Sequence, residues 1–247
     1  LVKKYINHIK PLFCYAFYIC SVCYTISITL CVKSLTIVII ILIATSNHCY
    51  ICPIYDIIHI NLHIRHIIRR NILNYAEIKY NDIANGPGVR TSIFVSGCTH
   101  HCKGCFNEIA WDFNYGTPFT NATISDIINS MKPDYIAGLT LLGGEPFEPA
   151  NQRGLIPLLK AVKENYPAKD IWCFTGYLFD EDIMDKMYDK YPETREMLSY
   201  IDVCVDGRFV EELKDMMLKF KGSSNQRTIL VQQSLKEGTV VTAEEYQ

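Results

Sequence analysis

Short runs of apolar, β-branched and aromatic residues recur after residue 73 and predict buried strands. The runs are TSIFVS (91–96), GLTLL (138–142), IWCF (171–174), IDVCV (201–205) and RTILV (227–231). Each is four to six residues long, which is a usual strand length. The pattern therefore predicts a sheet whose strands lie inside the protein.

Apolar residues recur at helical spacing between these runs. The three stripes are Ile124, Ile127, Ile128 and Met131; Leu155, Leu158, Leu159 and Val162; and Ile183, Met184 and Met187. Such spacing places the apolar side chains on one face of a helix, which can then pack on a sheet. Strands that alternate with helices imply right-handed crossovers and a mostly parallel sheet. Because five units are too few for a closed eight-stranded barrel, we predict an α/β fold with a partial, open β/α barrel.

Polar and glycine-rich segments follow four of the predicted strands. They are SGCTHHCKGC (96–105), GGEP (143–146), TGY (175–177) and DGR (206–208). Parallel sheets bind ligands at the carboxyl ends of their strands. We therefore expect these four segments to meet at one functional edge of the sheet.

Residues 1–72 differ in composition from the rest of the chain. They carry a net charge of +6 against −2 for the whole chain, which leaves −8 for residues 73–247, and they contain none of the 13 glycines. Uncharged runs at 11–32 and 34–47 are compatible with a membrane anchor. The alternative, which we favour, is that Leu73 is the natural start, because bacterial translation can begin at a leucine codon and the first methionine is Met131. On either interpretation, residues 73–247 form the functional domain.

Three cysteines follow the first predicted strand in a Cys-x3-Cys-x2-Cys motif, Cys98, Cys102 and Cys105. Three thiolates on a short loop can bind three irons of a [4Fe-4S] cluster and leave the fourth iron open to a substrate. The same cysteines with His100 or His101 would also make a Cys3His zinc site. The motif alone leaves both kinds of metal centre open.

The cysteine motif, combined with GGEP after the second strand, resembles the radical S-adenosylmethionine (SAM) superfamily. Within it, the stretch from about residue 74 to about residue 232 resembles the activating proteins of anaerobic ribonucleoside-triphosphate reductases, a group of glycyl radical enzyme activases. The segments that carry this resemblance are NGPGVR (85–90), CFNEIAW (105–111), NYGTPFT (114–120), WCFTGY (172–177), VDGRFV (205–210) and GSSNQR (222–227). One departure is Gly104, which stands where many superfamily members carry an aromatic residue.

The resemblance implies a set of cofactor ligands. Cys98, Cys102 and Cys105 would bind the [4Fe-4S] cluster, and SAM would chelate the open iron through its amino and carboxylate groups. Contacts to SAM would come from Gly104, Cys105 and Phe106 along the adenosine, from Gly143, Gly144 and Glu145 at the methionine amino group, and from Thr175, Asp206 and Arg208 at the next two strand ends. No other catalytic residue is implied, and neither His100 nor His101 is assigned a role.

The resemblance also implies an activity. A flavodoxin or ferredoxin would reduce the cluster, and SAM would be cleaved to methionine and a 5′-deoxyadenosyl radical. The radical would take a hydrogen atom from a glycine of the large catalytic subunit of the reductase, so the substrate is a protein. One alternative is an activase of another glycyl radical enzyme, such as pyruvate formate-lyase. An alternative from another class is a zinc-binding interaction module on a membrane anchor.

Charge, motifs and cysteine content limit the possible partners and the location of the protein. The net charge of −8 after residue 72, without a basic stripe interleaved with aromatic residues, argues against a nucleic-acid partner. No phosphate-binding loop motif is present. Five cysteines after residue 72 come without a secretory signal, so we expect reduced thiols and a cytoplasmic protein. Membrane attachment would follow only if residues 1–72 are translated.

Overall fold

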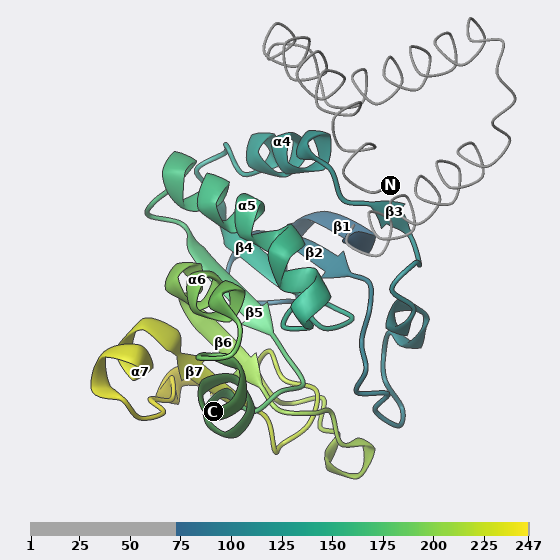
Figure 1. Cartoon of the computed structure of the whole chain (residues 1–247), viewed down its shortest axis with the longest axis vertical. Helices are drawn as coiled ribbons and strands as arrows, with labels where there is room; N and C mark the ends of the chain where they lie inside the picture. The colour runs from purple at the N-terminus through teal and green to yellow at the C-terminus, as the bar shows by residue number, and fades with distance from the viewer. Residues whose placement is uncertain (1–72, 247) are drawn as a thin grey trace, which may run out of the picture. The chain divides into compact units, whose positions relative to one another are not determined.

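A computed structural model describes residues 73–246 of the chain (Figure 1). Within that span the strands form one seven-stranded sheet in the order β3-β1-β2-β4-β5-β6-β7. Their bounds are β1 Asn74–Asp82, β2 Val89–Val95, β3 Thr117–Pro118, β4 Ile136–Gly143, β5 Asp170–Phe174, β6 Val203–Asp206 and β7 Arg227–Leu230. No helix of residues 73–246 is long and apolar enough to cross a membrane. The start site and membrane anchor considered for residues 1–72 lie outside the described residues.

Helices of several kinds connect the strands or follow the last of them. They are α4 Asn121–Ser130, α5 Pro149–Asn165, α6 Pro192–Tyr200, α7 Val231–Glu237, the π-helix η2 Phe179–Met187, and the 3-10 turns η1 Glu108–Trp111, η3 Glu211–Leu213 and η4 Glu244–Tyr246. Two of the predicted apolar stripes are confirmed, since they lie on α4 and α5. The third stripe lies in η2, so the expected helix is present there, as a π-helix. The buried residues of η2 are four positions apart, a spacing that does not separate the two helix types.

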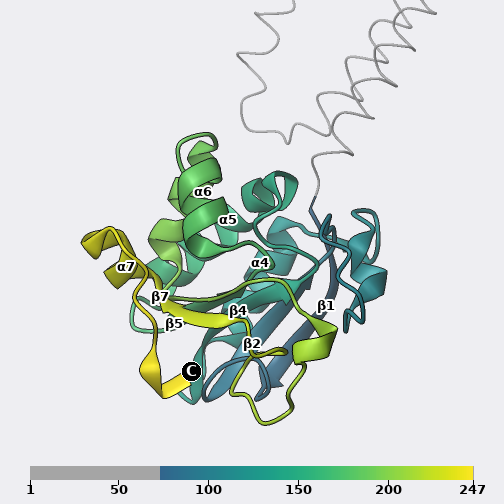
Figure 2. The same cartoon turned by 90° about the horizontal axis from the view of Figure 1, so that it is seen from below.

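The four middle strands, β2, β4, β5 and β6, are parallel neighbours. This arrangement confirms a mixed α/β fold whose sheet is parallel in the middle, whereas the outer strand pairs are antiparallel. The strands are adjacent in chain order, so right-handed crossovers put the connecting helices on one face of the sheet. Figure 2 shows α4, α5 and α6 along that face.

The outer strands differ from the prediction. The segment RTILV was expected among the parallel strands, but β7 runs antiparallel to β6 because the chain returns through a loop without a crossover helix. Strand β1 was not predicted, since most of its side chains are exposed or half-buried and its sequence is polar. It pairs antiparallel with β2 and with β3.

The two faces of the sheet pack into different layers. On the helix side, Ile93, Leu139 and Leu141 enter the main hydrophobic core together with Leu155 and Leu158 of α5. Burying one such side chain stabilises the fold by about 1.5–3 kcal/mol. The other face carries a smaller cluster, made of Trp172, Val203, Val205, Phe174, Phe220, Leu230 and Tyr246. That second face also borders the cavity that holds the candidate site.

Candidate functional site

A cavity of about 590 Å³ opens where the parallel strands end. Residues that follow β2, β4, β5 and β6 all line it, so the four strand-end segments meet as expected. The predicted site residues in its wall are Cys98, Cys102, Cys105, Phe106, Gly143, Gly144, Glu145 and Thr175. Gly104, Asp206 and Arg208 lie outside this lining.

The three thiols of the motif stand around the cavity on the loop after β2. Cys98 is buried, and Cys102 and Cys105 are half-buried. Burial raises the pKa of Cys98 to about 11 and raises the pKa of Cys102 above its ordinary value. Because iron binds thiolates, any metal bound by these groups would release protons from them.

The donor set fits a cluster with one open iron. The other cysteines of residues 73–246, Cys173 and Cys204, are fully buried in β5 and β6 and do not line the cavity. Within the same residues, no three side chains of His, Cys, Asp or Glu converge on one metal-ion position. The three cavity thiols are of the ligand type that binds iron in a [4Fe-4S] cluster, and they are one fewer than its four irons.

Backbone hydrogen bonds hold the cysteine loop closed. The amide of Gly97 donates to the carbonyl of Ala110 at 2.8 Å, and the amide of Cys98 donates to the carbonyl of Trp111 at 3.1 Å. His101 stacks on the Trp111 ring, with 4.5 Å between ring centroids. The loop thus has a defined shape that comes from its own chain.

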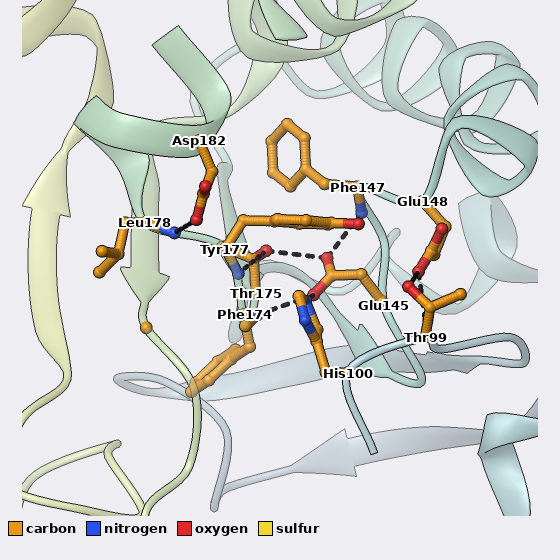
Figure 3. A network of polar contacts seen from close by, with 12 residues as sticks. Thr99, His100, Glu145, Phe147, Glu148, Phe174, Thr175, Tyr177, Leu178 and Asp182 are labelled. Carbon is orange, nitrogen blue, oxygen red and sulfur yellow. Dashed lines mark hydrogen bonds and ion pairs between the residues drawn. The ribbon is translucent and has the colours of Figure 1, made fainter. Parts of the chain in front are cut away.

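The carboxylate of Glu145 is the centre of a buried hydrogen-bond network (Figure 3). Its Oε1 accepts from the amide of Phe147 and from the hydroxyl of Thr175, both at 2.8 Å. Its Oε2 accepts from the amide of Gly176 at 2.7 Å and from Nε2 of His100 at 3.0 Å. A carboxylate has about four acceptor positions, so the chain itself occupies all of them.

This network joins the cysteine loop to two strand ends. His100 belongs to the loop, Glu145 follows β4, and Gly176 follows β5. The His100 ring also packs edge-on against Tyr177, with 4.4 Å between ring centroids. Sequence reasoning gave His100 no role. The sequence did place His100 and Glu145 at the same edge of the predicted sheet, and this placement could have suggested that they bind each other.

A second carboxylate of the GGEP region binds the same loop. Oε1 of Glu148 accepts from the amide of Thr99 at 2.9 Å and also from the hydroxyl of that residue. Asn151 of α5 donates from its amide nitrogen to the carbonyls of Gly97 and Glu145, at 3.2 and 2.9 Å. The start of α5 therefore holds the cysteine loop through hydrogen bonds of Glu148 and Asn151.

The glycines of GGEP are required by close packing of the chain on itself. A Cβ added to Gly143, which has φ +110°, would lie 2.6 Å from the backbone of Phe94. A Cβ on Gly144 would lie 2.6 Å from the carbonyl oxygen of Gly97. Such distances are well inside van der Waals contact, so no side chain fits at either position. Sequence reasoning had attributed these glycines to the approach of a ligand.

Asp206 is bound by the chain at the end of β6. Its buried carboxylate accepts from the amide of Phe179 at 2.8 Å and from Nε of Arg227 at 3.0 Å. Arg227 also binds Asp180, and the two carboxylates together raise the pKa of its guanidinium. Arg227 was not predicted as a site residue. A contact between Asp206 and SAM stays a prediction.

Gly104 belongs to the cysteine loop and Arg208 lies close to it, but neither residue lines the cavity. The positive charge of Arg208 acts against the effect of burial on the pKa of Cys102, so this side chain is close to the loop. Gly104 has φ +69°, and a Cβ there would lie 2.9 Å from the carboxylate of Glu211. The contacts predicted between these residues and SAM stay predictions.

Removing Arg227 is expected to destabilise the fold strongly. Arg227→Gln leaves the buried Asp206 carboxylate without its cation, so we expect the free energy of unfolding to fall by about 3–5 kcal/mol. Asp180→Asn is the matched control, because the Asp180 side chain is 45% exposed and its pair contributes at most about 1 kcal/mol. Anaerobic urea unfolding measures the stability of both variants. Equal unfolding midpoints would contradict the role of Arg227 as the cation that stabilises buried Asp206.

The same ion pair predicts a dependence of stability on pH. Arg227 lowers the pKa of Asp180 below its ordinary value of 3.8. A lowered pKa means that the folded state binds the proton more weakly than the unfolded state does. The contribution of Asp180 is therefore present above about pH 4 and is lost as the pH falls through the lowered pKa.

Known proteins resemble this chain over most of the described part. A family model described as a 4Fe-4S single cluster domain matches residues 84–229. A protein of Haemophilus influenzae named anaerobic ribonucleoside-triphosphate reductase-activating protein is 45% identical over 156 residues, which are 62% of this chain and 96% of the relative. Proteins of the same name from Escherichia coli K12 and Enterobacteria phage T4 are 42% and 41% identical, over 62% and 63% of this chain and 96% and 92% of their own lengths.

Proposed function

The chain belongs to the family of anaerobic ribonucleoside-triphosphate reductase-activating proteins, and from this premise we propose that it generates the glycyl radical of such a reductase. The observation that carries the proposal is one cavity with three cysteine thiols in its wall, at the meeting point of four strand ends. The protein substrate would be the large catalytic subunit of the reductase. The family also favours this substrate over pyruvate formate-lyase, and favours a [4Fe-4S] cluster over a zinc module.

The cavity residues provide for both cofactors. Cys98, Cys102 and Cys105 would bind the cluster, and SAM would complete the coordination of the fourth iron. When bound and reduced, the cluster would supply one electron for the cleavage of SAM. SAM would supply methionine as one product and the radical that removes a hydrogen atom from a glycine as the other. We propose that a flavodoxin or ferredoxin donates the electron and that the protein works in the cytoplasm.

The residues of the chain position these cofactors. Because the Glu145 carboxylate already accepts four hydrogen bonds from the chain, the backbone of the turn at Gly143 and Gly144 would meet the methionine part of SAM. Phe106 lies at the edge of the cavity, where it would pack along the adenosine. Arg208 would offer its planar guanidinium to the SAM carboxylate. We further propose that the sheet forms the wall of a partial barrel of the radical SAM type.

Electron paramagnetic resonance (EPR) tests this proposal directly. The anaerobically reconstituted chain is mixed with its large reductase subunit, SAM and dithionite. We expect a glycyl radical doublet that requires all four components. No doublet with the reductase, or a doublet formed instead on pyruvate formate-lyase, would reject the assignment.

A further inference from the structure

Large apolar side chains are exposed around the mouth of the cavity. Met216 and Met217 are 82% and 88% exposed, and Phe106 on the cysteine loop is 68% exposed. Met216 and Phe106 also line the cavity, so the exposed surface continues into the site. An apolar surface beside a functional cavity usually marks contact with another molecule.

The two methionines occupy the tip of a hairpin formed by residues 213–224, here named the methionine hairpin. The amide of Ser224 donates to the carbonyl of Leu213 at 2.9 Å, and Lys214 pairs antiparallel with Ser223. At the tip, the amide of Met217 donates to Oδ1 of Asp215 at 2.8 Å. These bonds give the tip a defined shape, so the methionines are presented to solvent by an ordered turn.

Phe220 anchors the methionine hairpin to the sheet. Its ring packs against Trp172 and Tyr246, with 5.6 and 5.7 Å between ring centroids. Phe220 has φ +56°, a conformation that costs energy for any residue except glycine. Burial of its aromatic ring offsets this cost. The fold therefore holds the phenylalanine half-buried against the sheet and leaves both methionines exposed.

We propose that the tip of the methionine hairpin and Phe106 form the docking surface for the reductase segment that carries the target glycine. The proposal rests on the activase function proposed above. Adenosine inside the cavity would cover one side of Phe106, but it gives no reason for the 88% exposure of Met217, which lies outside the cavity wall, whereas a protein substrate would cover both side chains. Methionine suits such a contact, because its flexible thioether adapts to an irregular peptide surface.

The distance requirement of the reaction favours the glycine segment over the electron donor. Transfer of a hydrogen atom needs the reacting atoms about 3–3.5 Å apart, so the glycine must pass the rim and enter the cavity that Met216 lines. An electron can cross several layers of protein atoms, so its donor need not touch this rim. The apolar surface that continues into the cavity is therefore the one that the glycine segment of the reductase contacts.

Met217→Ser tests the proposal, because Met217 lies outside the cavity wall. With dithionite as the reductant, we expect the KM for the reductase to rise about tenfold, the effect of losing one apolar anchor of an interface. SAM cleavage measured without the reductase is expected to stay unchanged, which shows that the variant is folded and loaded with its cluster. Met217→Leu, which keeps the apolar surface, is expected to stay within about twofold of the unsubstituted chain.

Tyr135→Ser is the control for a general surface effect. Tyr135 is 63% exposed but precedes β4, at the opposite end of the parallel strands, so the KM is expected to stay unchanged. An unchanged KM for Met217→Ser, with normal radical yield, overturns the docking surface and leaves the activase function intact. A defect seen only when flavodoxin replaces dithionite also overturns it. Absence of a glycyl radical with the unsubstituted chain refutes the proposed function itself.

Discussion

Cys102→Ala is expected to abolish the [4Fe-4S] cluster and, with it, the cleavage of SAM. Within residues 73–246 only three thiols line the cavity, so the variant retains two. Neither histidine of the loop is free to replace the lost ligand, because Nε2 of His100 binds Glu145 and the ring of His101 stacks on Trp111. Changing a residue that merely orients a metal ligand costs 10–100-fold, so losing the ligand itself should lower SAM cleavage by at least about a hundredfold.

Iron analysis and SAM cleavage under anaerobic conditions measure this effect. We expect about four irons per chain before the substitution, the content of one [4Fe-4S] cluster, and a large loss after it. Cys204→Ala is the matched control, since Cys204 is buried in β6 and does not line the cavity. Its cluster content should stay unchanged. A Cys102→Ala protein that keeps its iron and still cleaves SAM would remove the cluster assignment.

Glu145→Gln is expected to displace the cysteine loop and to weaken the fold. Glutamine puts an NH2 group where an oxygen now accepts, so it faces either Phe147 N–H and the Thr175 hydroxyl or Gly176 N–H and His100. Buried donors then lose their acceptor. Losing a hydrogen bond to a charged group costs about 1.5–3 kcal/mol, so we expect the free energy of unfolding to fall by about 3 kcal/mol. SAM cleavage should fall at least about tenfold, because a shifted loop no longer holds its thiolates in place.

The readouts for Glu145→Gln are urea unfolding and the change that SAM causes in the EPR spectrum of the reduced cluster. Glu164→Gln provides the control, since the Glu164 side chain is 62% exposed on α5. Its stability should stay within about 0.5 kcal/mol of the unsubstituted chain. If Glu145→Gln keeps both the unfolding midpoint and the SAM-dependent spectrum, the network does not position the loop.

The meeting of the strand-end segments could be predicted, because it needs only strand positions and the rules of parallel topology. Alternating strands and helices bring Cys98, Glu145 and Thr175 to one edge of a sheet whatever the fine geometry. The type of the η2 helix could not be predicted, since apolar residues four positions apart fit both an α-helix and a π-helix. Strand β1 was missed because its polar side chains leave no buried pattern to detect.

Side-chain partners across the sheet depend on register, which the sequence does not show. Asp206 lies directly opposite Arg227 in the antiparallel pair of β6 and β7, and their ion pair follows from that register. The sequence placed Asp206 only at a strand end, which led to its assignment to SAM and gave no sign of Arg227 as its partner. Glu145 was assigned to the methionine amino group of SAM because GGEP resembles the radical SAM motif, and that contact stays a prediction. Which donors surround a buried carboxylate is decided by tertiary packing, and the motif GGEP alone carries no such information.

The bonds from Gly97 to Ala110 and from Cys98 to Trp111 have a consequence for how the enzyme matures. A zinc finger must capture its ion in order to fold, because nothing else closes its ligand loop. Here the backbone closes the loop, and the sheet beneath it has its own core. Folding and metal loading are therefore separate events, and we expect the chain to persist as a stable scaffold until iron and sulfide are delivered to it.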